Sequence, residues 1–127
     1  MKDGLKEIAE KNAGVWKSSD YDELTRKEVE LLEQNNPEEF IESFYKNLEF
    51  GTGGLRGIMG VGTNRMNRYT VGMATQGFAN YISTQFCTQT ASVAVAYDCR
   101  NNSAEFARTA ANIFAANGLK VYLFESL

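Results

Sequence analysis

The chain has 127 residues, of which 43% are hydrophobic and 23% charged, a composition that suits one small globular domain or part of a larger protein. No segment is long and apolar enough to span a membrane, and the first residues, MKDGLKEIAEKNAG, lack the apolar core of a signal peptide, so we expect a cytoplasmic location. The chain contains no histidine, the commonest general base and metal ligand. Self-contained acid–base catalysis and a metal site within these residues are therefore not expected.

Charge is divided unevenly along the chain. Residues 1–47 hold 12 acidic and 7 basic residues, a net charge of −5, whereas residues 48–127 hold 4 acidic and 6 basic residues, a net charge of +2. A nucleic-acid surface would need a denser basic patch with interleaved aromatic residues, so that partner is not expected. The two cysteines, Cys87 and Cys99, have no metal-type spacing and are expected to be reduced, semi-buried thiols.

Three helices are predicted before residue 48. Residues 3–17 place apolar side chains at helical intervals, and a second helix, capped by Asp20 or Asp22, is expected to end near Glu33. The two aspartates could also be read as metal ligands, but capping is favoured because no third oxygen ligand is evident. Asn36 and Pro37 begin the third helix, which is expected to bury four side chains. These are Phe40, Ile41, Phe44 and Leu48.

A glycine-rich stretch follows, in which half of the residues from Gly51 to Gly62 are glycine. Thr52, Arg56, Arg65 and Arg68 lie in or next to it, and no carboxylate occurs from residue 51 to residue 90. Backbone N–H groups of glycine and arginine forks both suit an oxyanion, so a phosphate or carboxylate site is the functional interpretation. The structural alternative is a tight β-turn or bulge with its arginines in solvent.

Two standard phosphate loops are excluded within this stretch. A P-loop beginning at Gly57 has Thr63 where lysine is required, and a dinucleotide fingerprint beginning at Gly51 meets Arg56 at its third glycine position. The oxyanion interpretation therefore depends on no standard motif.

The second half of the chain predicts an α/β unit. A helix is expected over residues 69–86, with Asn67 as its cap and with an aromatic and apolar stripe as its core face. Strand-like runs at residues 90–97 and 119–124 flank a helix that begins near Ser103, which predicts a right-handed parallel crossover. The expected stripe of the first helix is Val71, Ala74, Phe78 and Ile82. The thin sheet ends at an open edge over residues 121–124, so we expect an N-terminal piece of a larger protein.

Four ordered blocks resemble the α-D-phosphohexomutase superfamily, most closely its phosphoglucomutase/phosphomannomutase branch. They are FYKNLEFGTGGLRG (44–57), MGVGTNRMN (59–67), YDCRNNS (97–103) and AANGLKVY (115–122). The resemblance implies an α/β fold, a three-layer α/β/α domain 1 with an incomplete mixed sheet. Residues 1–47 would form an N-terminal helical extension, and residues 48–127 would form the first domain, truncated before the catalytic serine.

The resemblance also implies an activity, the interconversion of hexose 1-phosphate and hexose 6-phosphate through a phosphoserine and a bisphosphate intermediate. Mg²⁺ and an activating hexose 1,6-bisphosphate would be required, and the partners would be a phosphosugar and the remaining domains of the same polypeptide. The family's serine lies in a Thr-x-Ser-His-Asn-Pro motif, which a chain without histidine cannot contain. No catalytic residue is therefore expected here, and these residues alone should be inactive.

Four residues carry the substrate-binding expectation. Arg56 matches the family's active-site arginine, while Thr52, Gly53 and Gly54 match the loop that holds it. Arg100 matches a position that looks structural, and the role of Arg65 is open. The alternatives are a phosphopentomutase or a hexose-bisphosphate synthase of the same branch, or a non-catalytic phosphate-binding or interaction module.

Overall fold

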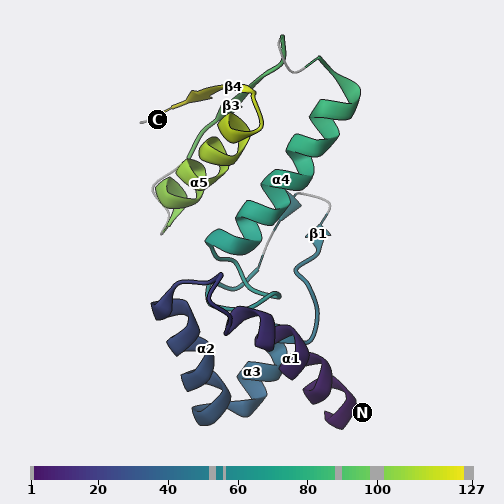
Figure 1. Cartoon of the computed structure of the whole chain (residues 1–127), viewed down its shortest axis with the longest axis vertical. Coiled ribbons are helices and arrows are strands. Elements are labelled where there is room, and N and C mark those ends of the chain that lie inside the picture. Colours follow the sequence, from purple (N-terminus) through teal and green to yellow (C-terminus); the bar gives the residue numbers. More distant parts are fainter. Residues whose placement is uncertain (1, 52–53, 56, 88–89, 98–101, 125–127) are drawn as a thin grey trace. The chain divides into compact units, whose positions relative to one another are not determined.

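The computed structural model describes residues 2–51, 54–55, 57–87, 90–97 and 102–124 (Figure 1). The chain divides into two compact units, Met1–Asn67 and Arg68–Leu127, and each is described by itself. The first unit contains α1 (Lys2–Trp16), α2 (Glu23–Asn35), α3 (Pro37–Phe44), β1 (Phe50–Gly51) and β2 (Gly54–Leu55). The second contains α4 (Arg68–Gln85), β3 (Ser92–Val95), α5 (Ser103–Ala116) and β4 (Lys120–Leu123).

Both helix starts predicted in the first unit are confirmed by their caps. Asp22 accepts hydrogen bonds from the backbone nitrogen and the hydroxyl of Thr25, at 3.0 and 2.6 Å, so it caps α2 and the metal interpretation is not needed. Asn36 accepts from the backbone nitrogen of Glu39 at 3.3 Å, and Pro37 opens α3. Side-chain oxygens here satisfy N–H groups that have no partner within a first helical turn.

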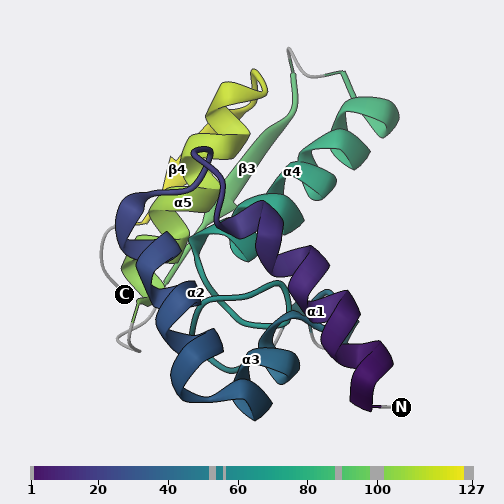
Figure 2. The same ribbon diagram turned by 60° about the horizontal axis from the view of Figure 1, so that its bottom comes forward.

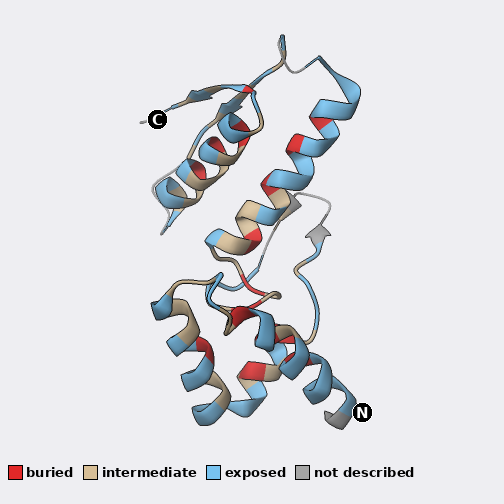
Figure 3. Ribbon diagram, viewed as in Figure 1, coloured by how far each residue is buried: buried red, intermediate tan, exposed pale blue. Residues whose placement is uncertain are grey.

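The core of the first unit joins its three helices. Each of α1, α2 and α3 carries buried residues, and the three helices contact one another (Figure 3). The Trp16 ring stacks on Tyr21 at 4.7 Å between centroids and meets the edge of Phe44 at 5.6 Å. The buried hydrophobic residues are Ala9, Ala13, Trp16, Val29, Phe40 and Phe44. Two of the four predicted α3 core residues are thus fully buried, while Ile41 and Leu48 are half-buried.

The second unit confirms the predicted strand–helix–strand arrangement. β3 and β4 pair in parallel, from Ser92 opposite Lys120 to Val95 opposite Leu123. Helices α4 and α5 lie side by side, and α5 also contacts both strands (Figures 1 and 2). The core cluster is Ala79, Ile82, Phe114 and Leu119, against which Val93, Val95 and Val121 pack. This is the α/β fold predicted from the sequence.

The core face of α4 agrees only in part with the predicted one: Ile82 is buried and Val71 and Ala74 are half-buried, whereas Phe78 is exposed. Phe78 is 53% exposed. Among the described aromatic contacts, its ring packs against that of Phe114 in a T-shaped arrangement, with 5.8 Å between the ring centroids. The residues that α4 buries are Thr70, Thr75, Ala79 and Ile82. A Cβ added at Gly72 would lie 3.1 Å from Ile113 Cδ1, so α4 and α5 approach too closely for large side chains at their contact.

Polar side chains also join α4 to the end of α5. Gln76 and Asn117 exchange two amide hydrogen bonds, of 3.0 and 2.9 Å. Asn117 Nδ2 also donates to the carbonyl of Ile113 at 2.8 Å, and the backbone nitrogen of Gly118 donates to Ala115 at 3.0 Å. The carboxyl end of α5 is thereby held against the middle of α4.

The described strands form two separate two-stranded sheets, one antiparallel and one parallel. The antiparallel pair, β1 with β2, belongs to the same compact unit as the N-terminal helices. The predicted domain boundary between residues 47 and 48 stays a prediction.

Cys87 is exposed, so the expectation of a semi-buried thiol is wrong for this residue, and Cys99 lies outside the described residues. In the described parts of the chain, no helix has the length and apolarity to span a membrane.

Candidate functional site

The four residues expected to bind substrate follow or lie within a short β-hairpin. β1 pairs with β2 through Phe50 opposite Leu55 and Gly51 opposite Gly54. Gly54 is therefore a strand residue whose backbone is engaged in the ladder. Thr52, Gly53 and Arg56 lie outside the described residues. The ligand role of these residues stays a prediction.

The second half of the glycine-rich stretch, residues 57–67, is anchored on the end of α3. The backbone nitrogen of Asn64 donates to the carbonyl of Ser43 at 3.0 Å, and its side chain donates to the carbonyl of Glu42, also at 3.0 Å. The Thr63 hydroxyl donates to the carbonyl of Lys46 at 2.7 Å. The last carbonyls of a helix have no N–H partner within the helix, and residues of this loop donate the missing hydrogen bonds.

Two glycines of the loop have structural reasons for being glycine. Gly62 has φ +126°, and a Cβ there would lie 2.3 Å from the carbonyl oxygen of Ser43. Gly60 has φ +152° with open space around it. Asn67 Nδ2 donates to the carbonyls of both glycines, at 2.9 and 3.0 Å. These glycines allow the loop to turn and to touch α3, as the structural alternative predicts, although Arg65 is buried and not in solvent.

Arg65 is part of the same anchor and does not belong to an anion site. Its residue exposure is 6%, and its Nη2 forms an ion pair with Glu39 Oε1 at 2.9 Å. Its Nη1 donates to the carbonyl of Asn64 at 3.1 Å. Glu39 lies on α3, N-terminal to residues 51–90, which contain no carboxylate. The carboxylate that balances the charge of Arg65 therefore lies outside the stretch considered for the anion site. The open question about Arg65 is thus answered: it binds the loop to α3.

The remaining arginines contribute no described anion site. Arg68 begins α4, where its Nη2 donates to the Tyr69 hydroxyl at 2.8 Å and its guanidinium lies 4.9 Å from that ring centroid. Arg100 lies outside the described residues, as does Asp98, its expected neighbour. Among the described residues, no group of three or more histidine, cysteine, aspartate or glutamate side chains is placed to hold a metal ion.

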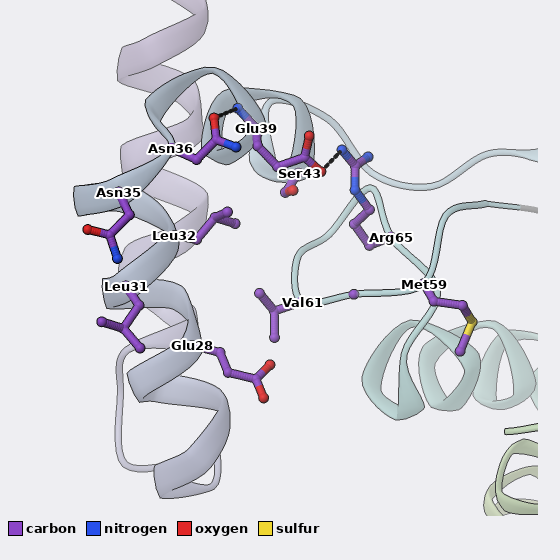
Figure 4. A pocket seen from close by; sticks show the side chains of 11 residues that line it. Glu28, Leu31, Leu32, Asn35, Asn36, Glu39, Ser43, Met59, Val61 and Arg65 are labelled. Carbon is purple, nitrogen blue, oxygen red and sulfur yellow. Dashed lines mark hydrogen bonds and ion pairs between the residues drawn. The ribbon is translucent and has the colours of Figure 1, made fainter. Parts of the chain in front are cut away.

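One cavity in the first unit was not anticipated from the sequence. It has a volume of about 390 Å³ and lies between α2, the start of the loop and the end of α3 (Figure 4). Its signal in the sequence is a stripe of α2 at helical spacing, residues 28, 31, 32, 35 and 36. That stripe mixes charged, apolar and amide side chains, which is why it did not stand out.

Comparison with known proteins identifies related sequences for nearly the whole chain. A family described as phosphoglucomutase/phosphomannomutase, alpha/beta/alpha domain I, matches residues 47–127. A human phosphopentomutase is 37% identical over 134 residues, covering 98% of this chain and 22% of the relative. A Staphylococcus epidermidis phosphoglucomutase is 40% identical over 89 residues, covering 70% of this chain and 16% of the relative.

A probable phosphoribomutase of Schizosaccharomyces pombe is 38% identical over 114 residues, covering 88% of this chain and 19% of the relative. The chain thus spans about a fifth of the length of the curated relatives that it matches. No solved structure matches it.

Proposed function

The chain belongs to the α-D-phosphohexomutase superfamily and carries domain I of its phosphoglucomutase/phosphomannomutase branch, and on that premise we propose that it contributes the first domain of a phosphosugar mutase. The proposed whole protein moves a phosphoryl group between the 1-oxygen and the terminal oxygen of a sugar phosphate, through a phosphoserine. The domain I match over residues 47–127 carries this proposal, because it contains the hairpin and all four substrate-binding candidates.

Within that reaction we assign binding and orientation to this chain. Arg56 follows β2 directly, and the proposal gives its guanidinium the role of holding the phosphate oxygens of the substrate in a bidentate contact. Thr52, Gly53 and Gly54 would form the loop that holds this arginine. Phosphoryl transfer depends mostly on positioning and charge stabilisation, so a fixed arginine is a useful contribution without any proton transfer.

The nucleophile is proposed to lie outside these residues, since the serine motif contains a histidine and this chain has none. Mg²⁺ would neutralise phosphate charge in the complete site. That requirement, and activation by a hexose 1,6-bisphosphate, remain expectations from the resemblance.

Two substrate classes are proposed for the complete protein. A hexose phosphate is the first, as the family description and the phosphoglucomutase relatives suggest. A pentose phosphate is the second, because the phosphopentomutase similarity extends over 98% of this chain, including the N-terminal helices that the family match omits.

The test uses the polypeptide encoded by the whole reading frame that contains these residues, beside the 127-residue chain alone. Both are assayed with Mg²⁺ and a bisphosphate primer, on glucose 1-phosphate and on ribose 1-phosphate. We expect turnover of one sugar phosphate by the longer polypeptide and none by the 127-residue chain. Turnover by neither polypeptide would favour a phosphate-binding or interaction module.

The role of Arg56 is tested in the active polypeptide. Removing a charge-assisted contact worth about 1.5–3 kcal/mol predicts that Arg56→Ala lowers kcat/KM by about 10- to 100-fold. Arg56→Lys keeps the charge and loses the planar fork, so it should recover only part of the loss. Arg108→Ala removes a matched, exposed arginine from α5 and should leave the rate unchanged. An unaltered rate in Arg56→Ala would remove that residue from the site.

A further inference from the structure

The cavity of the first unit is a groove along one face of α2. Glu28, Leu31, Leu32, Asn35 and Asn36 form one wall at helical spacing, and Met59, Gly60 and Val61 form the opposite wall. Glu28 lies at one end, and Glu39, Ser43 and Arg65 lie at the other (Figure 4). Eight residue steps along α2 and its C-cap lead from Glu28 to Asn36, which at about 1.5 Å per step gives the groove a length of about 12 Å.

The middle of the groove is apolar and accessible. Leu31 is 55% exposed and Met59 is 44% exposed, while Leu32 and Val61 are half-buried. Exposed apolar side chains that face each other across a cavity gain free energy when an apolar group covers them, at about 25 cal/mol per Å². The groove therefore suits an aliphatic side chain at its centre.

Polar groups with unused hydrogen-bonding capacity surround this apolar centre. The Ser43 side chain lines the buried end of the groove, with a residue exposure of 1%. Asn36 uses its oxygen to cap α3, which leaves its amide nitrogen available, and the Asn35 carboxamide makes no hydrogen bond within the described parts of the chain. Carboxamides match the donor and acceptor of a peptide group.

The net charge of the groove determines which charge a bound segment should carry. Arg65 is neutralised by Glu39 at 2.9 Å, whereas Glu28 forms no ion pair with any described residue. One negative charge is therefore left over, in a part of the chain whose net charge is −5 over residues 1–47. A phosphate or an acidic segment would be repelled, and a lysine or arginine side chain would be attracted to the Glu28 end.

We propose that this groove binds an extended peptide segment of a partner protein, in which a lysine or arginine neighbours an aliphatic residue. The basic side chain pairs with Glu28, and the aliphatic side chain packs between Leu31 and Val61. The peptide backbone meets the amides of Asn35 and Asn36. A groove of about 12 Å accommodates about four extended residues at about 3.3 Å each. The proposal does not depend on the mutase function, because it uses none of the predicted substrate-binding residues.

A displayed random heptapeptide library, sorted on the 127-residue chain at physiological ionic strength, tests the proposal. We expect enriched sequences to contain lysine or arginine within two positions of leucine, isoleucine, valine or methionine. The most enriched peptide is then labelled with fluorescein, and its Kd is measured by anisotropy. Failure to enrich any sequence would overturn the proposal, and so would enrichment of acidic peptides or of basic peptides without an aliphatic neighbour.

Matched variants then locate the bound peptide. Glu28→Gln should raise its Kd by about two- to fivefold, the range of an exposed ion pair, whereas Glu30→Gln removes the same charge from outside the groove and should not change it. Leu31→Ala should raise the Kd by about tenfold through lost apolar contact, with Leu24→Ala as its exposed control on the same helix.

Loss of folding can be recognised independently of binding. Trp16 is the only tryptophan and is 3% exposed, so an unchanged emission spectrum shows that the first unit is folded in each variant. Equal effects of Glu28→Gln and Glu30→Gln, or no effect of Leu31→Ala, would mean that the peptide binds elsewhere, and the proposal would be wrong.

Discussion

Replacement of Gly62 by alanine should destabilise the first unit more than any other single methyl group added to the loop. The new Cβ would lie 2.3 Å from the carbonyl oxygen of Ser43, whereas comfortable C···O contacts are about 3.3 Å or longer, so the loop must retreat by about 1 Å. That movement breaks the 3.0 Å hydrogen bond from Asn64 to Ser43.

The magnitude follows from two contributions. A non-glycine residue held at φ +126° costs about 1–3 kcal/mol, and loss of one backbone hydrogen bond costs about 0.5–1.5 kcal/mol. We therefore expect Gly62→Ala to lower the free energy of unfolding of the first unit by about 2–4 kcal/mol. Gly60→Ala carries only the backbone contribution, because a Cβ at Gly60 would meet nothing within 4 Å.

Urea unfolding followed by Trp16 fluorescence measures this difference. Since m in urea is typically about 1–3 kcal/mol/M, Gly62→Ala should lower the midpoint by about 1 M or more, and Gly60→Ala should lower it by clearly less. Trp16 packs against Tyr21 and Phe44, so its signal reports the unit that contains the loop. Equal midpoints for the two variants would refute the argument that the Ser43 contact requires glycine.

Four further substitutions test individual interactions by unfolding measurements. Glu39→Ala leaves the buried Arg65 guanidinium without its counter-charge and should cost about 2–3 kcal/mol; a loss below 0.5 kcal/mol, well under the value of a charged hydrogen bond, would contradict this. Asp22→Ala removes the cap of α2 and should cost about 1 kcal/mol, and unchanged stability would show that water replaces the cap. Phe78→Ala should lower the free energy of unfolding far less than Phe114→Ala, for which a loss of about 3–5 kcal/mol is expected. Unfolding of these two variants is followed by circular dichroism. Equal losses would favour the aromatic core face predicted from the sequence.

Local signals in the sequence were sufficient to predict the order of the helices and the starts of α2 and α3, but not the end of α3, which lies at Phe44 and not beyond Leu48. Asp22 and Asn36 cap the helices that follow them, because capping depends only on residues within three positions. The parallel pairing of β3 with β4 was also predictable, since a strand, a helix and a strand with short connections have few alternatives. These features are local in sequence or constrained by topology.

The core face of α4 was not predictable in the same way. The stripe containing Phe78 is the more hydrophobic one, but the distance between α4 and α5 decides which stripe is buried. At Gly72 the helices are too close for a large residue. Thr75 can be buried there because its hydroxyl donates to the carbonyl of Val71 at 2.7 Å and so stays satisfied.

The candidate site was predictable only in part. The glycine-rich stretch was recognised, but the sequence could not show that its two halves differ in role. Arg65 and Gly62 are explained by contacts with Glu39 and Ser43, which precede them by about 20 residues or more. The groove on α2 was missed for the same reason, because its opposite wall comes from residues 59–61.

The amide pair between Gln76 and Asn117 has a consequence for the chemical ageing of the protein. An asparagine followed by glycine loses its side-chain amide when the glycine nitrogen attacks the carboxamide carbon and closes a five-membered succinimide. Here Gly118 already donates its N–H to Ala115 at 3.0 Å, and the Asn117 carboxamide is held by Gln76 and Ile113. Because the Gly118 nitrogen and the Asn117 carboxamide are both held in place, Asn117 should deamidate slowly while the second unit is folded and quickly once it unfolds.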